Sequence, residues 1–253
     1  MGLSLGRGIE GAVPSGSLEA SNDERTGKAK KQKAMSILHP HKMGRNDQIG
    51  YFMPKTWAFW RSLIVCFFLF SIVGHWLEIP YCWFMNECFG VVDADYAVWT
   101  DPWWHPYWVY GFGAVVMTLV IEPLKESIVL RRKTLWGAVL ETFAIAVVLA
   151  MVMELVIGWL VNQPDATGKY PYWDNSEMPL NVFGQAWLVN DVAIGLVTLL
   201  YLWVFYPLIC NVFLVLKPRT ANVVFAVIMV VFGLGIASSY LHLALFPPLP
   251  AVG

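Results

Sequence analysis

Apolar residues are concentrated in five long runs beyond residue 56 of the chain. Each run has near or above the roughly 17 to 25 residues that a membrane-crossing helix needs. Hydrocarbon offers no partner for an unpaired backbone group, and the alternating pattern of a membrane barrel is missing, so each run is predicted to be an α-helix. The five predicted helices cover residues 57–79, 107–130, 134–161, 186–207 and 221–246. The pattern predicts an all-α, polytopic integral membrane protein with five transmembrane helices.

Residues 1–50 form a separate, polar part of the chain. They are rich in Gly, Ser, Asn, Asp and Lys, contain few aromatic residues and show no hydrophobic period. Such a segment cannot bury enough apolar surface to offset the entropy of ordering itself. The sequence therefore predicts a disordered basic tail over residues 1–50 and a membrane domain over residues 51–253.

Basic residues are unevenly distributed around the predicted helices. All Lys and Arg except Lys169 fall up to Arg61, within residues 125–133, or at Lys217 and Arg219. The positive-inside rule then predicts a cytoplasmic N-terminus and an external C-terminus. Tryptophans gather at the predicted outer ends of the helices and in the outer loops, where an indole can be half apolar and half wet. They are Trp76, Trp83, Trp99, Trp103, Trp104, Trp108, Trp159, Trp173 and Trp187.

Composition agrees with a membrane protein and excludes other classes. Hydrophobic residues make up 57% of the chain and charged residues only 14%, whereas an ordinary soluble domain has roughly 25% charged residues. We therefore expect a multi-pass protein of the cell membrane, with membrane lipid as a partner. The net charge is −1 and the basic residues form no folded basic domain, so no nucleic-acid partner is expected.

Five of the acidic residues within the apolar runs or at their ends are singled out as candidates. A carboxylate inside a membrane is unfavourable by several kcal/mol unless it is paired or protonated, so such acids are candidate functional residues. No Lys or Arg is expected deep in any helix. Glu122, beside Pro123, is expected to be a solvated helix end. The five acids are Glu78, Glu122, Glu141, Glu154 and Asp191.

Two of these acids fall at the same depth, near the predicted outer interface. Glu78 and Glu154 are level with the loop that carries Trp173 and Asp174. We predict an outward-facing polar pocket in which Glu78, Glu154 and Asp174 bind a cation or take up a proton. The alternative is structural: the two glutamates accept hydrogen bonds from indoles and loop amides and anchor the outer loop. Asp191 completes the candidate set.

Five short strings together resemble the CmpB-type ABC-transporter permease family. They are residues 71–78 (SIVGHWLE), 110–113 (YGFG), 154–160 (ELVIGWL), 172–176 (YWDNS) and 181–185 (NVFGQ). The resemblance covers roughly residues 60–210 and implies an ABC permease, with Trp173, Asp174 and Asn181 joining the acids as substrate-binding residues. His75, Asn175 and Gln185 stand where the family usually has Trp, Tyr and Arg, and the Gly-x-Leu-x-Gly-Pro string before the second helix is missing. The chain thus resembles a divergent member.

The sequence lacks the motifs of a motor or a catalyst. It has no phosphate-binding loop, nucleophile elbow or dinucleotide fingerprint, so we expect neither an enzyme nor a cofactor. A permease of this kind needs a separate ATPase subunit, and five helices suggest a homodimer or a second membrane subunit. The alternative function is a non-transporting scaffold or regulator that binds another membrane protein or lipid at its aromatic outer face, through Trp99, Trp103 and Trp104.

Two further possibilities concern metals and cysteines. His75 and Glu78 share one helical face, and His105 lies in the next loop, but these residues lack the spacing of a known metal motif and no metal is predicted. Cys82 and Cys88 lie in the predicted first outer loop, where an oxidising exterior permits a disulfide. The alternative is that both are unpaired thiols.

Overall fold

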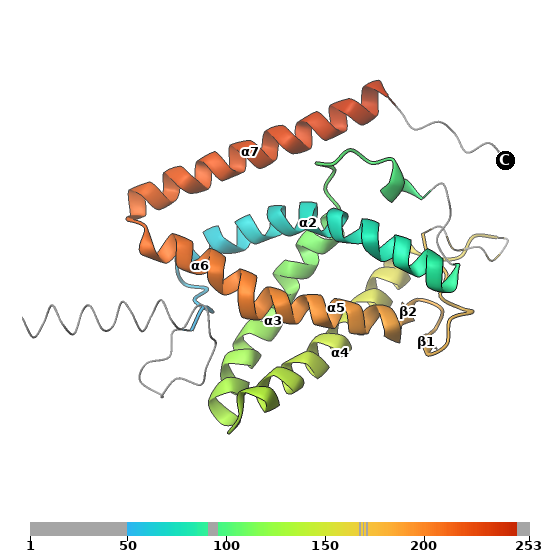
Figure 1. The fold of residues 1–253 in the computed structure, drawn as a ribbon, viewed down its shortest axis with the longest axis horizontal. Helices are drawn as coiled ribbons and strands as arrows, with labels where there is room; N and C mark the ends of the chain where they lie inside the picture. Colours follow the sequence, from blue (N-terminus) through green and yellow to red (C-terminus); the bar gives the residue numbers. More distant parts are fainter. Residues whose placement is uncertain (1–49, 91–95, 167, 169, 171, 247–253) are drawn as a thin grey trace, which may run out of the picture. The chain divides into compact units, whose positions relative to one another are not determined.

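The computed structural model describes residues 50–90, 96–166, 168, 170 and 172–246, all within the unit His41–Gly253. This part of the chain is almost entirely helical (Figure 1). Its long helices are α2 (Trp57–Phe89), α3 (Trp108–Arg131), α4 (Leu135–Val161), α5 (Leu188–Leu200), α6 (Tyr206–Val215) and α7 (Pro218–Leu245). Short elements are the 3-10 turn η1 (Ala97–Trp99), the π-helical segment η2 (Tyr201–Phe205) and the paired strands β1 (Asn181–Val182) and β2 (Ala186–Trp187). Apart from Gly50, the predicted tail lies outside the described residues.

Four helices of the described chain are long and apolar enough to cross a membrane. They are α2, α4, α7 and the continuous helix Leu188–Val215, in which α5, η2 and α6 follow without a break. Helix α3 occupies the position of the second predicted span but is not among these four. It carries Glu122, Lys125 and Glu126 in its last ten residues. The structure thus shows an all-α membrane protein, while a fifth span and the orientation of the termini stay predictions.

Helix α2 is ten residues longer than the sequence pattern predicts. It begins after Thr56, whose side-chain oxygen accepts a hydrogen bond from the Phe59 amide, and it continues through Pro80. It ends at Gly90, which has a φ of 64°. Glycine adopts this left-handed conformation without the steric penalty of a Cβ atom and is common after a helix C-terminus. The predicted first outer loop is therefore helical up to Phe89.

This extension changes the interpretation of the cysteines. Cys82 and Cys88 both lie on α2, and six positions at 100° per residue turn them about 120° apart around the helix. Cys82 is buried and Cys88 exposed, and all four cysteines are free thiols in the structure. The disulfide alternative is therefore wrong for this fold.

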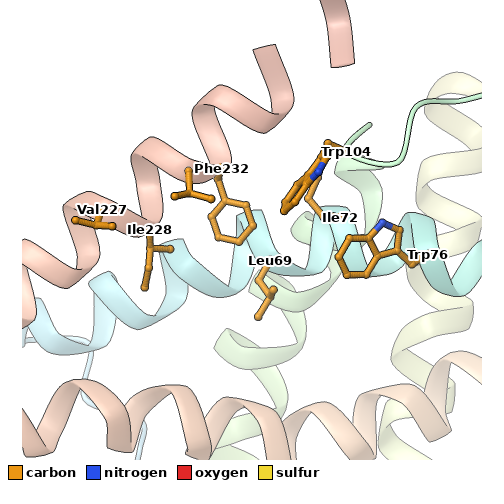
Figure 2. Close-up of a pocket in the computed structure, with 8 residues that line it drawn as sticks. Leu69, Ile72, Trp76, Trp104, Val227, Ile228 and Phe232 are labelled. Carbon is orange, nitrogen blue, oxygen red and sulfur yellow. The ribbon is translucent and has the colours of Figure 1, made fainter. Parts of the chain in front are cut away.

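Helix α2 lies at the centre of the packing. It contacts α3, α6 and α7, while α4 contacts α3 and α5. Phe59, Leu63, Cys66 and Phe70 of α2 form a core with side chains of α3, α4 and η2. Helices α2 and α3 cross closely at Gly111, which has no Cβ atom. A Cβ atom there would collide with the Ser71 side chain and with the backbone of α2. An apolar groove of about 270 Å³ separates α2 from α7 (Figure 2) and includes none of the candidate site residues.

The helices define two ends of the bundle. We call the "acidic end" the one formed by residues 78–90, 96–107, 154–166 and 172–191. We call the "basic end" the one formed by residues 50–61, 122–141 and 206–222, which carries Arg131, Arg132, Lys217 and Arg219. The acidic end is the predicted outer side and the basic end the predicted cytoplasmic side.

Candidate functional site

Three acids from three different helices gather at the acidic end. Glu78 lies on α2, Glu154 near the end of α4, and Asp191 in the first turn of α5. Helices α4 and α5 pack against each other and are joined by the 162–187 loop, so the end of one meets the beginning of the other. The two predicted glutamates and Asp191 therefore belong to one region of the fold.

Glu78 is held entirely by neutral donors. The Tyr110 hydroxyl of α3 donates to its Oε2, and the Tyr96 hydroxyl donates to its Oε1 over 3.2 Å. The Cys82 thiol lies 3.9 Å from the same Oε1. Burial raises the pKa of Tyr96, and the neighbouring Glu78 carboxylate raises it further, so that hydroxyl stays protonated and keeps donating.

Glu154 receives hydrogen bonds from the beginning of α5. The backbone N–H of Trp187, immediately before the helix, donates to Oε2 over 3.3 Å, and the Asn190 amide donates to Oε1. A carboxylate at this position satisfies a free N–H group and is stabilised by the helix dipole. Tyr81 of α2 donates to Asn190 Oδ1 over 2.9 Å and so links α2 to Glu154.

Asp191 differs from both glutamates. Its side chain is fully buried, and among the described residues no hydrogen-bond donor reaches either of its carboxyl oxygens. Its interacting neighbour is the carboxyl group of Glu154. Two carboxylates side by side repel each other, and a buried charge without a partner is strongly unfavourable. Asp191 is therefore a buried acid without a hydrogen-bond donor, beside an acid that has two.

The predicted loop residues bond mainly within their own loop. Trp173 Nε1 donates to the Gln185 carbonyl over 2.9 Å, and Asp174 Oδ1 accepts from the Ser176 amide over 2.9 Å. Asn181 Nδ2 donates to the Met178 carbonyl over 2.8 Å. In the described chain, no hydrogen bond or ion pair joins Asp174 to a candidate glutamate. The structure thus brings Asp191, rather than Asp174, to Glu154.

Asn162 and Gln185 organise this loop and were not among the predicted site residues. Asn162 is fully buried at the end of α4, where its Nδ2 donates to the Trp173 carbonyl over 2.7 Å and to Gln185 Oε1 over 3.0 Å. Gln185 Nε2 donates to the Asn162 carbonyl over 3.1 Å. The position where the family usually has Arg is thus a buried, neutral, hydrogen-bonded amide. A polar residue directly after a long apolar run was the available signal for Asn162.

The histidines are placed in aromatic surroundings. His75 is fully buried and stacks on Tyr107 at 4.5 Å, and Tyr107 donates to Asp101 over 3.0 Å. His105 Nδ1 lies 3.1 Å from the Ser239 hydroxyl of α7. Within the described residues, no group of three His, Cys, Asp or Glu side chains could hold a metal ion.

The basic end contains a buried ion pair that contradicts one expectation. Glu122 is fully buried, and its Oε2 lies 2.6 Å from Lys125 Nζ, which also donates to the Leu202 carbonyl of η2 over 2.7 Å. The prediction of a solvated helix end at Glu122 is wrong because this face of α3 packs against η2. Lys125 and Arg61 are buried as well, and both lie near the basic-end terminus of their helix.

A short segment before α2 packs across the basic end. The backbone N–H groups of Tyr51 and Phe52 donate to Glu126 Oε1 over 2.6 and 3.0 Å. Asn211 of α6 donates to the Tyr51 hydroxyl over 2.7 Å, and burial raises the pKa of that hydroxyl. Glu141, by contrast, forms a partly exposed pair with Arg131 and Arg132 in the α3–α4 hairpin. The acids of the basic end thus have cationic or backbone N–H partners.

Comparison with known proteins identifies one family. A family model with the description "Putative ABC-transporter type IV" (CmpB) matches residues 65–240, which is more than half of the chain. The matched range includes all three acids of the acidic end and the loop between α4 and α5, and it extends into α7. No curated protein and no solved structure matches the chain.

Proposed function

The chain belongs to the CmpB family of ABC-transporter type IV proteins, and from that premise we propose that it is a permease, the membrane subunit of a transport system whose ATPase is a separate chain. The family and the four apolar helices indicate a multi-pass membrane protein related to transport. The observation that carries the proposal is the gathering of Glu78, Glu154 and Asp191 at one end of the bundle. Acids at such positions mark substrate or ion pathways in membrane proteins.

The chemistry of the acidic end favours a positively charged solute. The donors to Glu78 and Glu154 are tyrosine hydroxyls, a thiol, an amide and a backbone N–H, all neutral. Among the described residues, the ion pairs involve Glu122 and Glu141 at the other end. Within the described residues, the acids of this end therefore have no ion-pair partner, and their field is strong in a medium of low dielectric.

In this proposal, the loop between α4 and α5 lies over the three acids and is linked to Glu154. Trp187, at the end of the loop, donates its backbone N–H to Glu154, and Trp173 is tied to Gln185 in the same loop. A solute that binds Glu154 would therefore affect the loop directly. In this role, Trp173, Asp174 and Asn181 shape the entrance to the site, and the three acids supply its charge.

We propose that the separate ATPase subunit binds at the basic end. The sequence contains no phosphate-binding loop, and the predicted topology places the basic end in the cytoplasm, where ATP is available. Two chains in a homodimer would supply the number of helices that a complete pathway needs. The cell membrane is the proposed location.

Purification from the native membrane tests this proposal. The tagged protein is extracted in mild detergent, and the expected result is a stoichiometric ATPase subunit identified by mass spectrometry. ATP hydrolysis by the reconstituted complex is then measured with a panel of cationic solutes. We expect Glu154→Gln to abolish stimulation, and Glu141→Gln, a matched change on the same helix at the basic end, to retain it. Absence of both an ATPase and solute flux in proteoliposomes would overturn the proposal.

The alternative function, a scaffold, is favoured by one observation. Trp83, Trp103 and Phe183 at the acidic end have exposed fractions of 60%, 60% and 75%. Large exposed aromatic side chains are typical of sites that bind other proteins or lipid headgroups. A scaffold predicts that purification yields a membrane partner without ATPase activity, and that Trp83→Ala and Trp103→Ala together release that partner.

A further inference from the structure

We propose that Glu154 and Asp191 bind one proton between them, with the Asp191 O–H donating to the Glu154 carboxylate, and that a cationic solute displaces this proton. This inference rests on the proposed function only for its second half, the displacement. The first half concerns the resting protein and can be tested without any substrate.

The hydrogen-bond partners of the two acids are unequal, and this assigns the proton. Glu154 accepts from the Trp187 backbone and from Asn190, as an ionised carboxylate does at the beginning of a helix. Asp191 is fully buried and accepts from no donor in the described chain. A carboxyl group without donors is satisfied only if it is itself a donor, and the acceptor beside it is Glu154. One proton thus removes both the repulsion and the unpaired charge.

Among the described residues, no cation is shown to interact with the pair in place of this proton. On α2, Tyr81 interacts with both acids, and Glu78 and Cys82 interact in turn with Tyr81. The titratable groups that α4 and α5 place here are Glu154 and Asp191 themselves. The Tyr110 hydroxyl of α3 donates its hydrogen bond to Glu78. Every one of these groups is neutral or acidic. Within the described part of the chain, a proton or a bound solute is therefore the remaining source of positive charge for the pair.

Proton and solute then compete for the same pair. When a cationic solute approaches Glu154, the Asp191 proton leaves to the aqueous side, and both carboxylates face the solute. When the solute departs, a proton returns and restores the hydrogen bond. Binding would release one proton per solute, so solute affinity would fall as the proton concentration rises. Two interacting carboxyls titrate as a pair, so the apparent pKa values describe the pair rather than either residue alone.

Infrared spectroscopy tests the resting state directly. The full-length protein is placed in lipid nanodiscs, and the C=O stretching band of protonated carboxyls is recorded at about pH 7, where an ordinary Asp is ionised. We expect a protonated-carboxyl band that shifts when aspartate is labelled with carbon-13 and that disappears in Asp191→Asn. Asn retains the shape of a protonated Asp and can still donate to Glu154, so this variant should fold. Glu141→Gln should leave the band unchanged.

The outcomes separate this inference from the proposed function. A band that is absent from the wild type, or present unchanged in both Asp191→Asn and Glu154→Gln, overturns the shared proton even if the protein transports a solute. A band that behaves as expected supports the proton, and it does so even if no ATPase is found. If Asp191→Asn fails to fold, the shift of the wild-type band on labelling aspartate rather than glutamate still decides where the proton lies.

Discussion

Replacing Lys125 by methionine is expected to destabilise the protein severely. Lys125 Nζ lies 2.6 Å from Glu122 Oε2 and donates to the Leu202 carbonyl in the π-helical segment. Methionine has a similar length but carries neither the charge nor a donor. The change therefore leaves Glu122 as an unpaired acid with no exposed surface, and it leaves the Leu202 carbonyl without its donor.

The magnitude follows from the burial of the pair. Removing one partner of a buried ion pair costs about 3 to 5 kcal/mol, because the remaining charge is neither solvated nor paired. The lost hydrogen bond to Leu202 belongs to the same network, so its contribution is not additive. Replacing both partners with apolar residues of similar size, as in Glu122→Leu with Lys125→Met, removes the unpaired charge. We therefore expect the double variant to recover most of the lost stability.

The assay is unfolding in mixed micelles with increasing sodium dodecyl sulfate, followed by the fluorescence of the 13 tryptophans. Arg132→Met is the matched control, because its partner Glu141 is partly exposed and also contacts Arg131. An exposed pair contributes little to stability, so the control should unfold almost as the wild type does. A Lys125→Met variant within about 0.5 kcal/mol of the wild type, or a double variant no more stable than the single one, would refute the reasoning.

Three further predictions concern packing, the loop and topology. Gly111→Ala should lower the free energy of unfolding by about 1 to 3 kcal/mol, because the added Cβ atom forces α2 and α3 apart. Gly113→Ala, with open space around its Cβ position, should leave it unchanged. Equal melting temperatures of the two variants would contradict this prediction. Asn162→Ala should lower stability by about 1 to 3 kcal/mol, because the Trp173 carbonyl and the Gln185 side chain lose their donor. The expected result is faster proteolysis within the 162–187 loop, and an unchanged cleavage rate would count against the prediction. A membrane-impermeant maleimide applied to intact cells should label Cys88 but not Cys82, without prior reduction; labelling only after lysis would reverse the predicted topology.

The helices could be predicted because a membrane restricts the backbone so strongly. All five predicted runs are helical in the structure, and the bounds of α3 and α4 differ from the prediction by one residue. The larger differences lie where local signals mislead. The first helix was predicted to end at residue 79, yet α2 continues through Pro80 to Phe89. The run predicted to end at 207 continues to Val215 through a π-helical segment that composition does not reveal.

The candidate site was predicted only in part. Depth along the helices placed Glu78 and Glu154 at one level, and the structure links the two regions through Tyr81 and Asn190. It also brings Asp191 to Glu154, whereas Asp174 bonds within the loop. Depth can be read from the position of a residue along its run, but the face that it turns to a neighbour depends on which helices pack together.

The sequence by itself determined that this protein is made of apolar helices, with most basic residues at one end and Glu78 and Glu154 at the other. Those properties follow from run lengths and from the order of residues, because hydrocarbon admits few backbone structures. Only the tertiary structure decided which charges are paired. Glu122 lies beside Lys125 and is compensated, while Asp191 lies against another acid and is not. The free energy of a buried charge depends on the atoms within a few ångströms, and helix packing brings those atoms together from distant parts of the chain.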